Sequence, residues 1–390
     1  MRSVYLDHNA TTPLLPEVLE AMQPYYTEKF GNPSSLYRRG CEAHAALKCA
    51  RESVAKLLGC QSTEVVFTGS GTEGDNLAIL GSLSAGDHVI TSRIEHSAVL
   101  NSFAYLEGMG VRVTRVPVDG QGRVDPQDVR RALRHDTQLI SIMMANNETG
   151  VLQPVEQIGV IAAEADVYFH VDAVQAAGKV PVSVEKIGCD LLTISGHKIY
   201  AQQGTGALFI RKGTRLKPLL HGGHQEGGRR PGTENLPGIV GLGRACELAL
   251  AALQDGTVEQ LAAWRNKLEE GVLNSIEGVG ANGREAERVS NTCNLYFDYI
   301  SGEALLVALD QQGIAVSAGA ACSAGAREPS HVLVAMGLAN ERARSSLRFS
   351  LGKLNSEDDI AYTLEVLPET VQQLRGKSPI YRKSTAGSRC

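Results

Sequence analysis

The chain has 390 residues, of which 43% are hydrophobic and 21% are charged, and its formal net charge is -5 at pH 7. These are globular proportions, so a disordered chain is excluded. The negative balance argues against nucleic acid as a partner. No run of about 18 apolar residues occurs, so we expect neither a transmembrane helix nor a membrane partner.

The cysteines and the first residues point to a reducing compartment. The chain has eight cysteines but no C-x-x-C pair, which removes the main signal of zinc ribbons and thioredoxin-type sites. The start lacks the apolar stretch of a secretory signal. We therefore expect a cytoplasmic protein with free thiols, most of them small buried side chains.

Strand and helix patterns alternate over the first part of the chain. Strands are predicted at residues 64–67, 88–91, 111–116, 138–143, 167–171, 191–194 and 206–210, with helices between several of them at 97–107, 126–133 and 155–163. This alternation is typical of βαβ units around a mostly parallel sheet, here of seven strands. The predicted fold class is therefore α/β.

The rest of the chain predicts a smaller α+β unit. Two long helical patterns, 238–253 and 258–273, flank Asp255-Gly256; then come a strand (292–297), a helix (302–311), a loop of small residues around Cys322, a strand (345–350) and a last helix. We predict a large domain of residues 15–255. Residues 1–14 and 256–376 form the small domain, and 377–390 form a flexible tail.

One glycine motif has two interpretations. The stretch from Gly69 to Gly74, GSGTEG, matches the dinucleotide fingerprint G-x-G-x-x-G, and a nicotinamide-dependent dehydrogenase is one alternative. Glycines at the start of a helix also let backbone N–H groups point at any phosphate. We favour the broader interpretation, a phosphate site.

Polar residues follow most of the predicted strands. Because ligands bind beyond the carboxyl ends of parallel strands, we expect these residues to meet at one rim. They are Gly71 and Thr72; His96; Asn146, Asn147 and Glu148; Asp172 and Gln175; and Ser195, His197 and Lys198.

Such a set suits pyridoxal phosphate. The Lys198 amine can form a Schiff base with the aldehyde of that cofactor, and Asp172 can pair with its pyridine nitrogen. Gln175 can donate to the ring hydroxyl oxygen, and His96 can stack on the ring. Backbone N–H groups at Thr72, Ser195 and His197 can hold the phosphate.

Several motifs carry a family resemblance. The stretch from Leu191 to Leu208, LLTISGHKIYAQQGTGAL, resembles the lysine segment of class V aminotransferases. Further stretches resemble cysteine desulfurases of the NifS/IscS type: YLDHNATTP (5–13), FGNPSSLY (30–37), ANNETG (145–150), FHVDAVQAAGK (169–179), HGGHQEGGRRPGTEN (221–235) and SAGAACSAG (317–325). The resemblance extends to about residue 380 and implies the fold type I of pyridoxal-phosphate-dependent transferases.

The resemblance implies an activity and partners. Such an enzyme removes sulfur from L-cysteine, giving L-alanine and a persulfide on Cys322. An iron–sulfur scaffold protein accepts the sulfur for cluster assembly. HGGHQE and EPSHVL are closest to nitrogen-fixation-type members, which suggests nitrogenase maturation as one use. The resemblance also implies a homodimer and no resident metal, although Cys322 can transiently contact a cluster on the scaffold.

Residue roles follow from the same resemblance. The implied catalytic residues are Lys198, Cys322 and the acid/base His96. Asn147 and Arg348 hold the substrate, and the guanidinium fork of Arg348 suits a carboxylate. The implied cofactor-binding residues are Gly71, Thr72, His96, Asn147, Asp172, Gln175, Ser195, His197, Lys198 and Thr233, the last reaching the phosphate across the dimer interface.

The chain departs from the family pattern at a few loop positions, which are the phosphate loop 69–74 (GSGTEG, where the family reads nearer S-G-G/A-T-E-S), Gln202-Gln203 after the lysine, Gly227, and Ala318 and Ala320 beside the cysteine. None of them removes a group that the chemistry needs. A selenocysteine lyase and a non-enzymatic sulfur-scaffold protein remain as alternatives.

Overall fold

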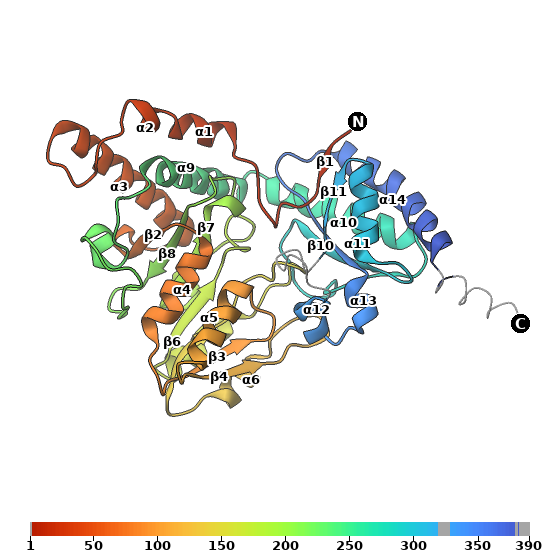
Figure 1. The fold of residues 1–390 in the computed structure, drawn as a ribbon, viewed down its shortest axis with the longest axis horizontal. Helices are drawn as coiled ribbons and strands as arrows, with labels where there is room; N and C mark the ends of the chain where they lie inside the picture. The colour runs from red at the N-terminus through yellow and green to blue at the C-terminus, as the bar shows by residue number, and fades with distance from the viewer. Residues whose placement is uncertain (1, 319–327, 379–380, 382–390) are drawn as a thin grey trace, which may run out of the picture.

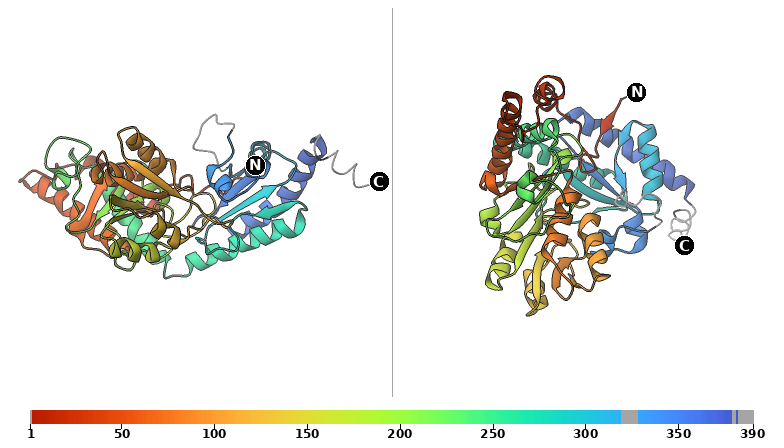
Figure 2. Two further views of the ribbon diagram at one scale, coloured as in Figure 1. Left: turned by 90° about the horizontal axis from the view of Figure 1, so that it is seen from below. Right: turned by 60° about the vertical axis from the view of Figure 1, so that its left-hand side comes forward.

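A computed structural model of the protein describes residues 2–318, 328–378 and 381. The chain forms two lobes, seen side by side in Figure 1 and end to end in the left view of Figure 2. Cys322, Cys390 and most of the expected tail lie outside the described residues. Lys377, which we expected in that tail, is instead the last residue of helix α14 (Glu357–Lys377).

The first lobe is built on a seven-stranded sheet of order β2-β8-β7-β6-β5-β3-β4. Its strands are parallel except β8, which runs antiparallel to both β2 and β7. The strands are β2 (Val65–Thr68), β3 (His88–Ser92), β4 (Arg112–Val116), β5 (Thr137–Ser141), β6 (Tyr168–Asp172), β7 (Leu191–Ser195) and β8 (Gly206–Ile210). The predicted mostly parallel sheet is confirmed, and each strand lies within a few residues of its predicted range.

Helices cover both faces of this sheet because neighbouring strand residues point to opposite sides. In β7, Leu192 packs with helices α3 and α9, whereas its neighbour Leu191 packs with α4. The helices of this lobe are α1 (Pro16–Met22), α2 (Pro24–Thr27), α3 (Arg38–Leu58), α4 (Gly71–Ser82), α5 (Ser97–Glu107), α6 (Pro126–Ala132), α7 (Val155–Glu164), α8 (Val184–Ile187) and α9 (Leu236–Ala252), with single 3-10 turns η1 (Ser62–Glu64), η2 (Gly196–Lys198) and η3 (Gln225–Gly228).

Helix α9 begins two residues before its predicted start. The Asn235 side chain accepts a hydrogen bond from the Gly238 N–H and caps the helix, and Pro237 lies in its first turn. Proline is tolerated there because the first N–H groups of a helix have no intrahelical partner. The prediction, based on the apolar pattern alone, missed this cap.

The second lobe has its own apolar core. Leu268, Leu295, Phe349 and Leu367 belong to it, and so does Val4 from the N-terminus, since strand β1 pairs with β11. Its elements are β1 (Val4–Tyr5), α10 (Thr257–Ser275), β9 (Val279–Ala281), β10 (Thr292–Phe297), α11 (Gly302–Gln311), β11 (Ile314–Ala315), β12 (Ser317–Ala318), α12 (His331–Ala335), α13 (Asn340–Arg344), β13 (Ser346–Ser350) and α14. The separate core supports the division into residues 15–255 and residues 1–14 with 256–376, which stays a proposal.

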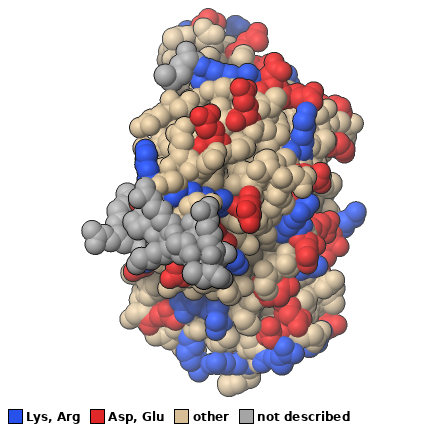
Figure 3. All heavy atoms as spheres, turned by 90° about the vertical axis from the view of Figure 1, so that its right-hand side faces the viewer, with Lys and Arg blue, Asp and Glu red and all other residues tan. Residues whose placement is uncertain are grey.

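Surface charge and the length of the apolar helices bear on the expected partners. Basic and acidic side chains are interspersed over the face shown in Figure 3. No single helix in the described part of the chain is long and apolar enough to cross a membrane; α9 and α10 pass that test only as a pair bent by 72°. The cytoplasmic location stays a prediction.

The expected burial of the cysteines is only partly right. Cys189, Cys246 and Cys293 are buried free thiols, as expected. Cys41 and Cys49 are exposed, so the expectation is wrong for them. Both lie on α3, whose buried positions include Leu47 and Ala50 on another side of the helix.

Candidate active site

One pocket of about 320 Å³ gathers most of the predicted site residues. It lies where β6 and β7 end and α4 and α5 begin, with Arg348 of β13 reaching in from the second lobe. Its lining includes Gly71, Thr72, His96, Asn147, Asp172, Gln175, Ser195, His197, Lys198 and Arg348. The expected rim at the carboxyl ends of the strands therefore exists as a single cavity.

The start of α4 forms one wall of the pocket. The Ser70 hydroxyl accepts from the Glu73 N–H, which caps the helix. A Cβ at Gly71 would lie 2.9 Å from Val174 Cγ2 and 3.2 Å from Ser195 Cβ, so glycine lets the helix begin against these residues. The first N–H groups of a 12-residue helix favour an anion at this wall.

Asp172, the last residue of β6, supplies a buried carboxyl. Its Oδ1 accepts from the Val174 N–H at 2.9 Å. Burial, with the nearby Asp75, raises the pKa of Asp172 to about 7. A carboxyl held this way gains most from a cation placed beside it, because a positive partner offsets the cost of burying its charge.

Lys198 points its amine at the N-terminal segment. It follows β7 on the turn η2, and its Nζ donates to the carbonyl oxygens of Asn9 at 2.6 Å and Ala10 at 2.7 Å. Two carbonyl acceptors fix the amine at the edge of the pocket that also contains Asp172. The placement brings an amine, a carboxyl and a helix N-terminus together.

His96 caps α5 with its ring. Its Nδ1 accepts from the Ala98 N–H at 3.1 Å, and burial lowers its pKa. A neutral imidazole whose Nδ1 is an acceptor carries its proton on Nε2. His96 therefore offers an N–H on its other edge. His197 is a second neutral ring, since burial lowers its pKa to about 4.

Arg348 connects the two lobes at the pocket. It is 5% exposed. Its guanidinium donates to the Asn147 carbonyl oxygen at 3.0 Å and to Asp7 Oδ1 at 2.6 Å. A guanidinium held from two sides is preorganised for a carboxylate ligand.

Three predicted residues in the described part of the chain do not line the pocket, and they are Asn146, Glu148 and Thr233. Asn146 and Glu148 of the expected rim are buried instead, where Asn146 Nδ2 donates to the Ile94 carbonyl oxygen and Glu148 Oε2 accepts from the Ser330 hydroxyl. Cys322 lies outside the described residues. Thr233 is exposed and does not line the pocket; its expected role needs a second copy of the chain, so it stays a prediction. The prediction also missed lining residues, namely Asn9, Ala10, Ser70, Asp75, Met143 and Val174.

Asp75 is the missed residue with the clearest physical consequence. Asp75 lies on α4 and is 1% exposed. Its Oδ1 has no hydrogen-bond partner within the described structure. The His170 imidazole, whose Nε2 is 3.5 Å from this oxygen, lies beside it. Burial raises the pKa of Asp75 to about 7. The folded state therefore holds a proton that the unfolded state releases near pH 4, so this carboxyl destabilises the fold progressively from about pH 4 to pH 7.

We expect Asp75→Asn to stabilise the cofactor-free protein. The variant removes a destabilisation of about 1.4 kcal/mol per unit of pKa shift. Its unfolding temperature should therefore be about 5 °C higher than that of the wild type at pH 8. At pH 5 the rise in unfolding temperature should be about a third of that. Thermal unfolding followed by circular dichroism measures both. The exposed Asp310→Asn is the control and should show no pH-dependent gain. An equal gain at both pH values would contradict the buried-carboxyl explanation.

Comparisons with known proteins agree with this fold and site. The model of the family described as aminotransferase class-V matches residues 4–362. Cysteine desulfurase IscS of Methanosarcina thermophila is 51% identical over 386 residues, which are 98% of this chain and 95% of that protein. A solved NifS-like protein has a TM-score of 0.89 at 39% identity, covering 96% of this chain and all of the other. SspA, solved in complex with cysteine, has a TM-score of 0.78 at 37% identity over 90% and 99% of the two chains.

The seven-stranded sheet and the lysine-centred pocket at its edge define the class as a class-V aminotransferase fold. Within that class, the chain belongs to the NifS/IscS-type cysteine desulfurases. The expected fold type I is thereby confirmed. The nicotinamide interpretation of residues 69–74 is not favoured, because the family model and the relatives are those of cysteine desulfurases.

Proposed function

We propose that the protein binds pyridoxal phosphate and uses it to remove sulfur from L-cysteine, giving L-alanine and a persulfide on Cys322. The observation that carries this proposal is the Lys198 amine in one pocket with the Asp172 carboxyl and the start of α4. The names of the relatives, cysteine desulfurases at about half identity over nearly the full chain, support the same reaction.

The residues present fit this cofactor. The pocket volume of about 320 Å³ lies within the range of small-molecule sites. The start of α4, with Gly71, Thr72 and Ser195, would hold the phosphate. Asp172 would hold the ring nitrogen, because burial raises the pKa of this carboxyl and a cation beside it would offset the cost of its charge. When bound, the cofactor would accept the electron pair released at the substrate Cα.

Lys198 and His96 would move protons. The Lys198 amine, held by backbone carbonyls, would take the proton from the substrate Cα as a neutral base. His96, neutral with its N–H on Nε2, would donate from that nitrogen and recover the proton later. Both groups line the same pocket, so neither requires a movement of the sheet.

Arg348 and Asn147 would orient the substrate. The Asn147 carbonyl already fixes the guanidinium of Arg348, which would take the cysteine carboxylate. Cys322 would then attack the substrate sulfur as a thiolate. The S–S bond forms as the Cβ–S bond breaks, the electron pair leaves toward Cβ, and a proton delivered there completes alanine.

We also propose that the protein acts as a homodimer that passes its sulfur to an iron–sulfur scaffold protein. Large apolar side chains cluster on one exposed segment: Tyr26, Phe30, Leu36 and Tyr37, of which Leu36 is 96% exposed. Surfaces of this kind are covered in the assembled state. Thr233 would then reach the phosphate of the partner copy.

The test is the visible absorption of the purified protein before and after L-cysteine, with alanine and sulfide assayed in the same sample. We expect a yellow protein whose band shifts on cysteine and equal yields of alanine and sulfide with excess reductant. A colourless protein that pyridoxal phosphate does not reconstitute would overturn the cofactor. A spectral shift without sulfide would move the search to another amino acid; selenocysteine is the first to compare.

A further inference from the structure

A second lysine, Lys179, lies directly behind Gln175. Its Nζ donates to Gln175 Oε1 at 2.6 Å and to Asn9 Oδ1 at 2.9 Å. Burial, with the charges of Lys198 and Arg348, holds the pKa of Lys179 well below its ordinary value. Neither the proton transfers nor the substrate contacts proposed above involve this amine.

The hydrogen bonds around Gln175 allow only one orientation of its amide. Its Nε2 donates to the Asn9 carbonyl oxygen at 3.0 Å, and a carbonyl can only accept. Its Oε1 accepts from the Lys179 amine on the other side. An amide rotated by half a turn would place two oxygens, those of Gln175 and Asn9, against each other.

Asn9 is fixed in the same manner, so it is a firm support for Lys179. Its Oδ1 accepts from Lys179 and from Asn291 Nδ2, and its Nδ2 donates to the Asn147 carbonyl oxygen. Asn9 is 2% exposed. A buried amide with partners on both atoms has no freedom to rotate, because rotation would leave polar groups unsatisfied.

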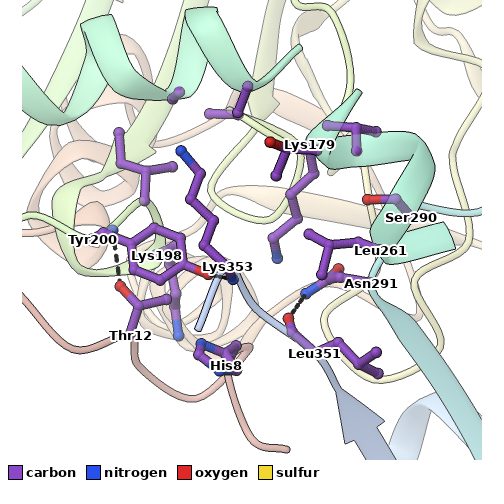
Figure 4. Close-up of a pocket in the computed structure, with 17 residues that line it drawn as sticks. His8, Thr12, Lys179, Lys198, Tyr200, Leu261, Ser290, Asn291, Leu351 and Lys353 are labelled. Atoms are coloured by element: carbon purple, nitrogen blue, oxygen red, sulfur yellow. Dashed lines mark hydrogen bonds between the residues drawn. The ribbon is translucent and has the colours of Figure 1, made fainter. Parts of the chain in front are cut away.

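A third lysine provides a comparison within the same cavity. Lys179, Lys198 and Lys353 all line a cavity of about 30 Å³ between the lobes (Figure 4). The Lys353 amine points toward α9 and donates to the Leu248 carbonyl oxygen at 3.0 Å. Lys353 therefore shares the surroundings of Lys179 but not its contact with Gln175.

We propose that Lys179 is a positioning residue: by holding Gln175 Oε1, it keeps the amide nitrogen of Gln175 toward the ligand pocket. An amide nitrogen has two N–H donors, and the Asn9 carbonyl uses one. The other is then available to an anionic ring oxygen of the cofactor. This inference rests on the proposed function, because it concerns how the pocket binds pyridoxal phosphate.

The test compares Lys179→Met with Lys353→Met, both loaded with pyridoxal phosphate. A donor to the ring oxygen favours its anionic form, which absorbs in the visible, over the protonated form, which absorbs in the near ultraviolet. For Lys179→Met we expect at least about a twofold fall in the visible to near-ultraviolet ratio and about tenfold weaker cofactor affinity, as for one hydrogen bond to a charged group. Lys353→Met should match the wild type. Circular dichroism verifies that each variant folds, and Lys179→Leu, which also carries no N–H donor, replaces Lys179→Met if the latter does not.

A double-mutant cycle separates positioning from a general structural effect. If Lys179 acts through Gln175, adding Lys179→Met to Gln175→Leu changes neither ratio nor affinity further. Lys179→Arg, which keeps N–H donors, should stay within about twofold of the wild type. Additive effects, or a Lys179→Met protein with the wild-type ratio, would overturn the inference. A wild-type protein that takes up no pyridoxal phosphate would instead overturn the proposed function.

Discussion

Lys198→Arg is expected to abolish alanine formation while leaving the fold intact. Arginine keeps N–H donors for the Asn9 and Ala10 carbonyl oxygens that Lys198 now engages. It stays protonated at any working pH, so it can serve neither as base nor as nucleophile. General base catalysis contributes up to about 10⁴-fold, and we expect kcat to fall by at least about 10³-fold.

Two measurements go with the Lys198 variant. Borohydride reduction followed by mass spectrometry should attach pyridoxal phosphate to the Lys198 peptide in the wild type and leave the variant unlabelled. Lys353→Arg, a lysine on the adjoining cavity, is the control and should keep both label and activity. Activity of Lys198→Arg within tenfold of the wild type would show that this amine is not the base.

Much of the site was predictable because the ends of adjacent parallel strands lie close together in the folded sheet. Asp172 is the last residue of β6 and Lys198 lies on the turn that follows β7, and these two strands pair in parallel and end at the same edge. Residues at the carboxyl ends of two paired parallel strands are therefore close together, whatever the conformation of the loops that follow them. The strand patterns were readable because each strand is short, buried and rich in branched side chains.

The hydrogen bonds that hold these residues in place could not be predicted from the sequence. Asn9 contacts Lys198, Gln175 and Lys179 across more than 160 positions of sequence. No local pattern encodes such contacts, since they arise only when β1 and its following segment dock between the lobes. The motifs that contain Asn9 and Lys179 were noticed, but only as marks of the family.

Asp75 was missed for a different reason. It belongs to the same segment as the phosphate loop. An acidic residue in the first turns of a helix is normally expected to be exposed to solvent, where it interacts favourably with the helix dipole. Its burial depends on Gly74, which lets α4 approach β7: a Cβ there would lie 2.8 Å from Thr193 Cγ2. The glycine that departs from the family pattern is thus a packing contact beside the site.

Cys322→Ser is expected to separate substrate binding from sulfur transfer, even though Cys322 lies outside the described residues. The substitution leaves Asp172, Lys198 and Arg348, which line the pocket, unchanged, so the variant should still show the spectral change on L-cysteine. A hydroxyl is not ionised near neutral pH as a thiol partly is, and we expect alanine and sulfide to fall more than about 100-fold. Mass spectrometry without reductant should find one added sulfur on Cys322 of the wild type, and on Cys322 of Cys41→Ser, the exposed-cysteine control. A persulfide on another cysteine, with alanine still formed by Cys322→Ser, would move the acceptor role to that residue.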